Sequence, residues 1–161
     1  MSDRGREGHR SAPSYSFGAT YMDACEEALR CGDRKVGNEH LLLALLRDST
    51  CRDSLGVDLD AARRALQAMD EDDLAAIGVD ARQCDAPPLA VHLSRFGAKL
   101  PLTPSAKGAL SDTVKTVGRR GLSPRHLLRQ LLARSDADVV SALVARLGVD
   151  RLAVIARLQE V

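Results

Sequence analysis

One leucine-rich segment occurs twice in this chain, and it restricts the possible fold more than any other feature. Residues 39–46 read EHLLLALL and residues 125–132 read RHLLRQLL, so that a charged residue and a histidine precede four leucines at matching places. The leucines occupy positions i, i+1, i+4 and i+5, which form one face of a buried α-helix. Because the segments lie in different halves of the chain, they predict two related helical units.

A second recurring unit is an aliphatic residue followed by Gly-Val-Asp, at residues 55–58, 77–80 and 147–150. Gly can end a helix in the left-handed conformation, and Asp can cap the start of the next helix. This unit follows the leucine-rich segment in both halves of the chain. The shared order predicts a duplication, with two copies packed around a common core.

Other helix signals are local. Helical spacing of apolar residues starts near Phe17 and stops near Gly32. The pairs Thr103-Pro104 and Ser123-Pro124 each place a capping hydroxyl before a proline, which suits the first helical position. No segment shows convincing two-residue alternation. We therefore predict an all-α fold, a tandem repeat of two small helical bundles packed as one domain.

Three polar positions complete the predicted boundaries. We expect Asn38 to cap the helix of the first leucine-rich segment, and Asp58 and Asp150 to cap later helices. The acidic run at residues 70–73 is expected in the first turn of a helix, where negative charge is favourable.

Four regions follow from this pattern: a disordered tail (1–14), a first repeat (15–83), a linker rich in Pro and Gly (84–101) and a second repeat (102–161). Aromatic residues make up only 2% of the chain, so the core must be built from Leu, Ala and Val, a composition that favours helices over sheets.

Composition also bears on location and partners. No stretch approaches the ~20 apolar residues of a membrane helix, and the polar first residues lack the apolar core of a signal peptide. We therefore expect a cytoplasmic protein without a membrane partner. In that location its four cysteines are expected to be free thiols. The net charge of +1 hides an acidic first half and a basic second half. We interpret these as solvated faces of opposite sign. The alternative is a basic surface for an acidic partner or phosphate.

No group of residues predicts catalysis or a cofactor. His40 and His126 lie in the first turns of buried helices, where a ring N–H can donate to a backbone carbonyl, and their spacing to other ligands fits no zinc motif. A hydrolase would need an activated nucleophile that the sequence does not supply. Arg125 and Arg129 belong to a basic helix face, but the scarcity of stacking aromatics disfavours nucleic acid. A small DNA-binding regulator, with the helix after Ser123-Pro124 as recognition helix, is the alternative function.

Two stretches resemble the amino-terminal domain of the Clp ATPases. Residues 24–47, ACEEALRCGDRKVGNEHLLLALLR, are similar to that family's A-x-E-E-A segment and its Thr-Glu-His-Leu-Leu-Leu. Residues 100–110, LPLTPSAKGAL, resemble the start of the family's second repeat, which opens with Thr-Pro-x-Ala-Lys. The chain contains no phosphate-binding G-x-x-x-x-G-K-[ST] loop, so the resemblance indicates a freestanding module without the ATPase engine.

The resemblance implies a non-catalytic protein-binding module that acts as adaptor, decoy or regulator in Clp-dependent proteolysis. Its partners would be proteins or peptides of the Clp chaperone–protease system. The groove between repeats would be the binding site, with these candidate residues: Glu39, His40, Arg125, His126 and Arg129. Some family members hold phosphorylated arginine through the Glu of each Glu-His pair. Glu39 matches this Glu, but Arg125 replaces the second, so capture in that manner is not expected.

Overall fold

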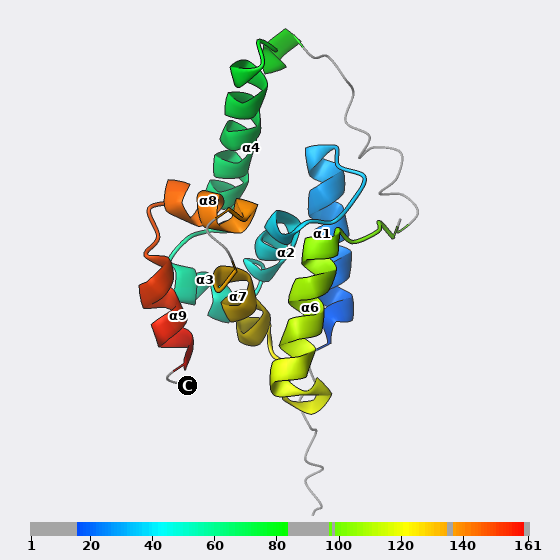
Figure 1. Cartoon of the computed structure of the whole chain (residues 1–161), viewed down its shortest axis with the longest axis vertical. Coiled ribbons are helices and arrows are strands. Elements are labelled where there is room, and N and C mark those ends of the chain that lie inside the picture. The colour runs from blue at the N-terminus through cyan, green and yellow to red at the C-terminus, as the bar shows by residue number, and fades with distance from the viewer. Residues whose placement is uncertain (1–15, 84–96, 98, 135–136, 160–161) are drawn as a thin grey trace, which may run out of the picture.

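Helices account for most of the residues that the structure, a computed structural model, describes, which are 16–83, 97, 99–134 and 137–159. Eight α-helices lie in these ranges (Figure 1): α1 (Phe17–Cys31), α2 (Asn38–Leu45), α3 (Ser49–Leu55), α4 (Leu59–Ala76), α6 (Pro104–Val117), α7 (Pro124–Leu132), α8 (Val139–Arg146) and α9 (Arg151–Gln159). Two short 3-10 turns, η1 (Ala81–Gln83) and η3 (Arg119–Gly121), complete them. The described residues form no β-strand, so the all-α prediction is confirmed. None of their helices has the length and apolarity to cross a bilayer.

The two leucine-rich helices, α2 and α7, lie in the middle of the molecule and contact each other. Their paired leucines are at most 1% exposed: Leu41, Leu42, Leu45, Leu46, Leu127, Leu128, Leu131 and Leu132. Burial of one such side chain stabilises the fold by about 1.5–3 kcal/mol. The leucine pattern therefore identified the centre of the core from sequence alone.

The helix contacts are nearly symmetric between the two halves. α1 packs on α2 as α6 packs on α7, and α2 contacts α8 as α7 contacts α3. In the same way α2 contacts α4 and α7 contacts α9, while α4 meets α8 and α9 meets α3. In Figure 1 the central helices are flanked by α1 and α6 on one side and by α3, α8 and α9 on the other. The contacts thus follow the arrangement expected of two docked bundles, while the duplication itself stays a prediction.

Most local boundary signals act as expected. Thr103 accepts a hydrogen bond from the Ala106 amide at the start of α6, and Pro104 is the first residue of that helix. Asp58 and Asp150 cap α4 and α9 through their carboxylates. In each case the capping residue satisfies an amide that the first helical turn leaves without an intrahelical partner.

Three expectations were wrong or incomplete. Gly37, not Asn38, precedes α2, and Asn38 is its first residue. The acidic run at 70–73 lies inside α4, the longest of the described helices, rather than in a first turn. The short helix α3 was not expected, because seven residues between two turns carry too little apolar periodicity to stand out.

Two extended segments join the halves of the chain ahead of α2 and α6. The Val36 amide donates to the Pro101 carbonyl at 2.9 Å, and the Thr103 amide donates to the Val36 carbonyl at 2.9 Å. The Tyr21 hydroxyl donates to the Leu100 carbonyl at 2.6 Å. The last residues of the expected linker are thereby held against the first half. The expected tail and residues 84–96 of the linker lie outside the described residues.

A buried carboxylate ties α1 to the elements that follow it. The side chain of Glu27 is 1% exposed and accepts hydrogen bonds from Arg63 on α4 (2.6 and 3.0 Å) and from Arg47, just after α2 (2.9 Å). Burial alone would raise the pKa of Glu27, but the hydrogen bonds from Arg63 and Arg47 outweigh it and hold the pKa below its ordinary value. This network fixes the positions of α1, α2 and α4, which together carry the site described next.

Candidate functional site

His40 occupies the first turn of α2 and serves as its cap. Its Nδ1 accepts a hydrogen bond from the Gly37 amide at 3.0 Å, while the ring is 1% exposed. The structural role expected for this histidine is therefore observed, but the direction of the bond was wrong: the ring accepts from a backbone N–H instead of donating to a carbonyl. The reason is the position of the ring at a helix start, where amides rather than carbonyls need partners.

Two carboxylates and a thiol surround the His40 ring. Nε2 lies 3.1 Å from Oδ2 of Asp33, without the alignment of a hydrogen bond, and Nδ1 lies 3.5 Å from Oε1 of Glu39. Burial by itself lowers the pKa of His40, but Asp33 and Cys31, with the charge of Glu39, raise it to about 9. The carboxylates of Asp33 and Glu39 thus place negative charge beside the ring at the start of α2.

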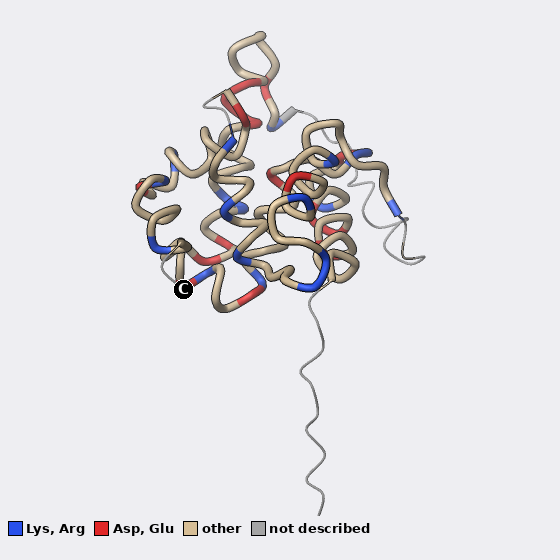
Figure 2. The backbone as a smooth tube through the Cα atoms, turned by 60° about the horizontal axis from the view of Figure 1, so that its bottom comes forward, with Lys and Arg blue, Asp and Glu red and all other residues tan. Residues whose placement is uncertain are grey.

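Further acidic groups come from α4, which contacts α2. Burial raises the pKa of Asp70, and the neighbouring charges of Asp33, Asp73 and Glu39 raise it further. The acidic stretch of α4 is visible as a red band in Figure 2. In the described part of the chain none of these four carboxylates forms an ion pair with Lys or Arg. We call this set, Asp33, Glu39, Asp70 and Asp73, the acidic surface.

Gly37 shapes the position of the Glu39 carboxylate. A Cβ atom at residue 37 would lie 2.6 Å from the carboxyl carbon of Glu39, so the carboxylate occupies the space that any larger residue would need. The Glu39 side chain is 21% exposed there. Its carboxylate thus lies close to the backbone at the start of α2 and is half-buried.

The equivalent position in the second half has different chemistry. His126 lies in the first turn of α7, and its Nδ1 is 2.7 Å from Oγ of Ser123. Arg125 stands where the first half has Glu39; it is half-buried, and its Nε atom has no hydrogen-bond partner among the described residues. Burial raises the pKa of Cys51 on α3 to about 12, and the charge of Arg125 acts against this rise. This half offers a partly covered cation in place of a carboxylate.

The contacts of the five residues expected to bind fall into two sets. Glu39 and His40 contact each other and His40 lies beside Asp33, whereas His126 contacts Ser123. No hydrogen bond or ion pair joins Glu39 to Arg125 in the parts of the chain that the structure describes. Arg129, in the last turn of α7, is half-buried. The binding role of the five residues, in a groove between the repeats, stays a prediction.

A polar cluster that sequence reasoning missed connects the two halves. The buried Asn38 donates through Nδ2 to Oγ of Ser105 on α6 (2.7 Å) and to Oδ2 of Asp138 (2.8 Å). Asp138 also caps α8 through the Val140 amide. Ser105 and Asp138 border a surface hollow of about 520 Å³ with Asp112, Gln130, Arg134 and Ala137. No local pattern of residues indicates this cluster, because its members meet only through packing of α2, α6 and α8.

Comparison with known proteins supplies a structural relationship. No protein-family model matches the sequence, and no curated protein matches it. Among solved structures, the N-terminal domain of the caseinolytic protease associated chaperone ClpD from Arabidopsis thaliana superimposes with a TM-score of 0.62. The match covers 94% of this chain and 96% of that domain, at 23% sequence identity. The chain has the fold of a Clp amino-terminal domain.

This Clp-like fold confirms the resemblance drawn from the sequence motifs. Coverage of both chains over nearly their whole length means that the likeness extends across both halves and is not limited to one leucine-rich helix. At this level of identity the match establishes the fold, while function must be argued from the site.

Proposed function

We propose that the chain is a non-catalytic protein-binding module that acts as adaptor, decoy or regulator in Clp-dependent proteolysis. The observation that carries the proposal is the Clp-like fold, which matches the ClpD domain over 94% of the chain. ClpD itself is a caseinolytic protease associated chaperone. The partners of this chain would accordingly be proteins or peptides of the Clp system.

The acidic surface is the part of the site that we assign to partner binding. Its four carboxylates have no Lys or Arg partner among the described residues, and the Glu39 carboxylate, close to Gly37, is 21% exposed. A carboxylate cluster of this kind favours cationic side chains, above all the guanidinium of arginine, which makes paired hydrogen bonds to carboxylates. We therefore expect a partner segment that carries Arg or Lys.

The packing of α7 supports this proposal over the DNA-binding alternative. A recognition helix must expose one face to a DNA groove. α7 contacts α2, α3, α6, α8 and α9, and four of its nine residues are buried. Little of its surface remains for a groove, and Arg125 is half-buried against α3.

Affinity capture from lysate tests the proposal. The wild-type chain is compared with Glu39→Ala and with Asp53→Ala, which removes an exposed carboxylate from α3, away from the acidic surface. We expect Clp subunits or their client proteins with the wild type and with Asp53→Ala, and a loss of at least about tenfold with Glu39→Ala. Equal capture by all three variants, or recovery of nucleic acid alone, would refute the proposal.

A further inference from the structure

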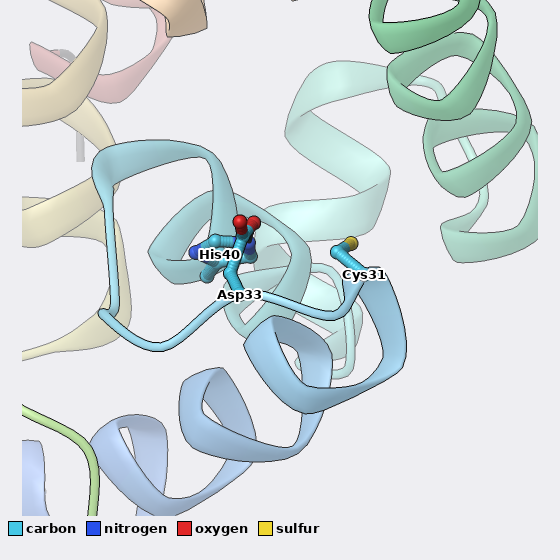
Figure 3. Close-up of side chains that lie close together, drawn as sticks. All are labelled: Cys31, Asp33 and His40. Carbon is cyan, nitrogen blue, oxygen red and sulfur yellow. Dashed lines mark ion pairs between the residues drawn. The ribbon is translucent and has the colours of Figure 1, made fainter. Parts of the chain in front are cut away.

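Three side chains of different chemistry converge where α1 ends and α2 begins. The Cys31 thiol, an Asp33 carboxylate oxygen and a ring nitrogen of His40 all lie within 4.8 Å of one another. Figure 3 shows them arriving from the last residue of α1, from the connecting turn and from the first turn of α2. Cys31 and Asp33 are exposed, whereas His40 is buried.

The buried histidine gives this group its significance. Nε2 of His40 lies 3.1 Å from Oδ2 of Asp33 without the alignment of a hydrogen bond and has no other partner among the described residues, although the ring is 99% buried. Buried polar atoms nearly always have a partner, so one that lacks it requires an explanation. The Nδ1 atom is engaged with Gly37 on the other side of the ring, which fixes the direction of Nε2 toward the thiol and the carboxylate.

Sulfur, imidazole nitrogen and carboxylate oxygen are the ligand types of zinc. Bond lengths of about 2.0–2.3 Å place the ligand atoms of a tetrahedral zinc site about 3.3–3.8 Å apart. The Asp33 oxygen and Nε2 of His40 are 3.1 Å apart, and the Cys31 sulfur lies within 4.8 Å of both. Rotation of the exposed Cys31 and Asp33 side chains can bring the three ligand atoms to the separations of a zinc site. Three protein ligands leave a fourth position for water or for a group from a partner.

We propose that Cys31, Asp33 and His40 form a zinc-binding site. The thiol loses its proton to solvent when it binds as thiolate, and Zn²⁺ takes the place of any proton on Nε2. Because Nδ1 accepts from the Gly37 amide in the metal-free protein, the proton of the neutral ring lies on Nε2 and must move to Nδ1 when Nε2 binds Zn²⁺. The Glu39 carboxylate, 3.5 Å from Nδ1, is placed to accept a hydrogen bond from that proton in exchange for the Gly37 contact, as ligating histidines commonly donate to carboxylates.

The negative potential around the site supports binding of a dication. Asp33 lies 3.1 Å from Nε2 and Glu39 lies 3.5 Å from Nδ1, and no Lys or Arg of the described chain pairs with either carboxylate. A bound Zn²⁺ would offset the repulsion between these negative charges. No metal site is expected from the sequence, because the histidines form no H-E-x-x-H motif and the cysteines form no C-x-x-C pair.

Titration of the intact, metal-free chain with Zn²⁺ and with Co²⁺ tests the proposal. Co²⁺ reports a thiolate ligand through its sulfur-to-metal charge-transfer absorption. The variants are Cys31→Ser and Asp33→Asn, which alter exposed side chains and leave the His40 cap in place. Cys84→Ser and Asp53→Asn are the matched controls, and circular dichroism verifies that each variant is folded.

We expect one Zn²⁺ per chain, with affinity at least about tenfold weaker in Cys31→Ser and in Asp33→Asn. The Co²⁺ charge-transfer band should be present in the wild type and in both controls and absent from Cys31→Ser. Binding of equal strength in Cys31→Ser, loss of the band in Cys84→Ser, or adventitious binding only, at millimolar metal, would overturn the proposal. None of these outcomes depends on the proposed protein partner.

Discussion

Replacement of Glu27 by Gln tests the packing of α1, α2 and α4 through a single buried charge. The carboxylate is 1% exposed and accepts three hydrogen bonds from the guanidinium groups of Arg63 and Arg47. Gln keeps the shape of the side chain but turns one acceptor into a donor. That donor faces an arginine donor, and both guanidinium groups lose their buried counter-charge.

The expected loss of stability follows from this geometry. Removal of one partner from a fully buried ion pair costs about 3–5 kcal/mol. The side chains of Arg47 and Arg63 are 31% and 23% exposed, so water can partly replace the lost carboxylate. We therefore expect Glu27→Gln to lower the free energy of unfolding by about 2–4 kcal/mol, which corresponds to a fall in Tm of roughly 5–15 °C for a chain of this length.

Urea unfolding followed by circular dichroism measures this loss. The neighbouring variant Glu26→Gln is the matched control, because Glu26 accepts a hydrogen bond from the same Arg47 at 3.0 Å but is 63% exposed. It should cost less than about 1 kcal/mol. Equal effects of the two substitutions would show that burial of Glu27 does not determine its contribution, and the reasoning would be refuted.

Three further outcomes follow from the same structure. Because the pKa of folded Glu27 lies below its ordinary value of 4.5, its stabilisation is complete above pH 4.5 and is lost as the pH falls through the folded pKa; the stability difference between wild type and Glu27→Gln should stay constant above pH 4.5 and narrow below it, and a difference that stays constant below pH 4.5 in urea titrations would contradict this. Asp138→Ala should lower the free energy of unfolding by about 2–4 kcal/mol, since it removes the α8 cap and one of the two acceptors of the buried Asn38 amide, leaving only Ser105; a loss under about 1 kcal/mol would argue against the cluster. In the presence of a metal chelator, iodoacetamide should label the exposed Cys31 of the native protein. It should label Cys51 only after unfolding, because burial shields this thiol and raises its pKa to about 12. Equal labelling rates of the two cysteines in mass spectrometry would contradict the structure.

The boundaries that sequence predicted are those set by local chemistry. Thr103, Asp58 and Asp150 cap helices through amides only three residues away, so their role can be recognised without any tertiary contact. The acidic run at 70–73 shows the limit of that approach, because acidic residues suit both a first helical turn and the exposed face of a long helix. Whether residues 70–73 begin a helix or lie inside a long one is decided by the packing of α4 against α2 and α8.

The candidate site was predicted less well than the fold. The repeated histidine position was identified correctly as structural at the start of a buried helix, because the leucine pattern fixes the helix. Asp70 and Asn38 acquire their significance from residues far away in the sequence, and nothing in the local pattern indicates those neighbours. The expectation that Arg125 shares a groove with Glu39 stays a prediction.

The most direct test of the proposed role is a degradation assay with a purified Clp ATPase–protease and a client protein. Addition of the wild-type chain at saturating concentration should change the rate of client degradation at least about twofold, and the same concentration of Glu39→Ala should leave the rate unchanged. A degradation rate that does not respond to the wild-type chain, or that responds equally to both proteins, would contradict the account.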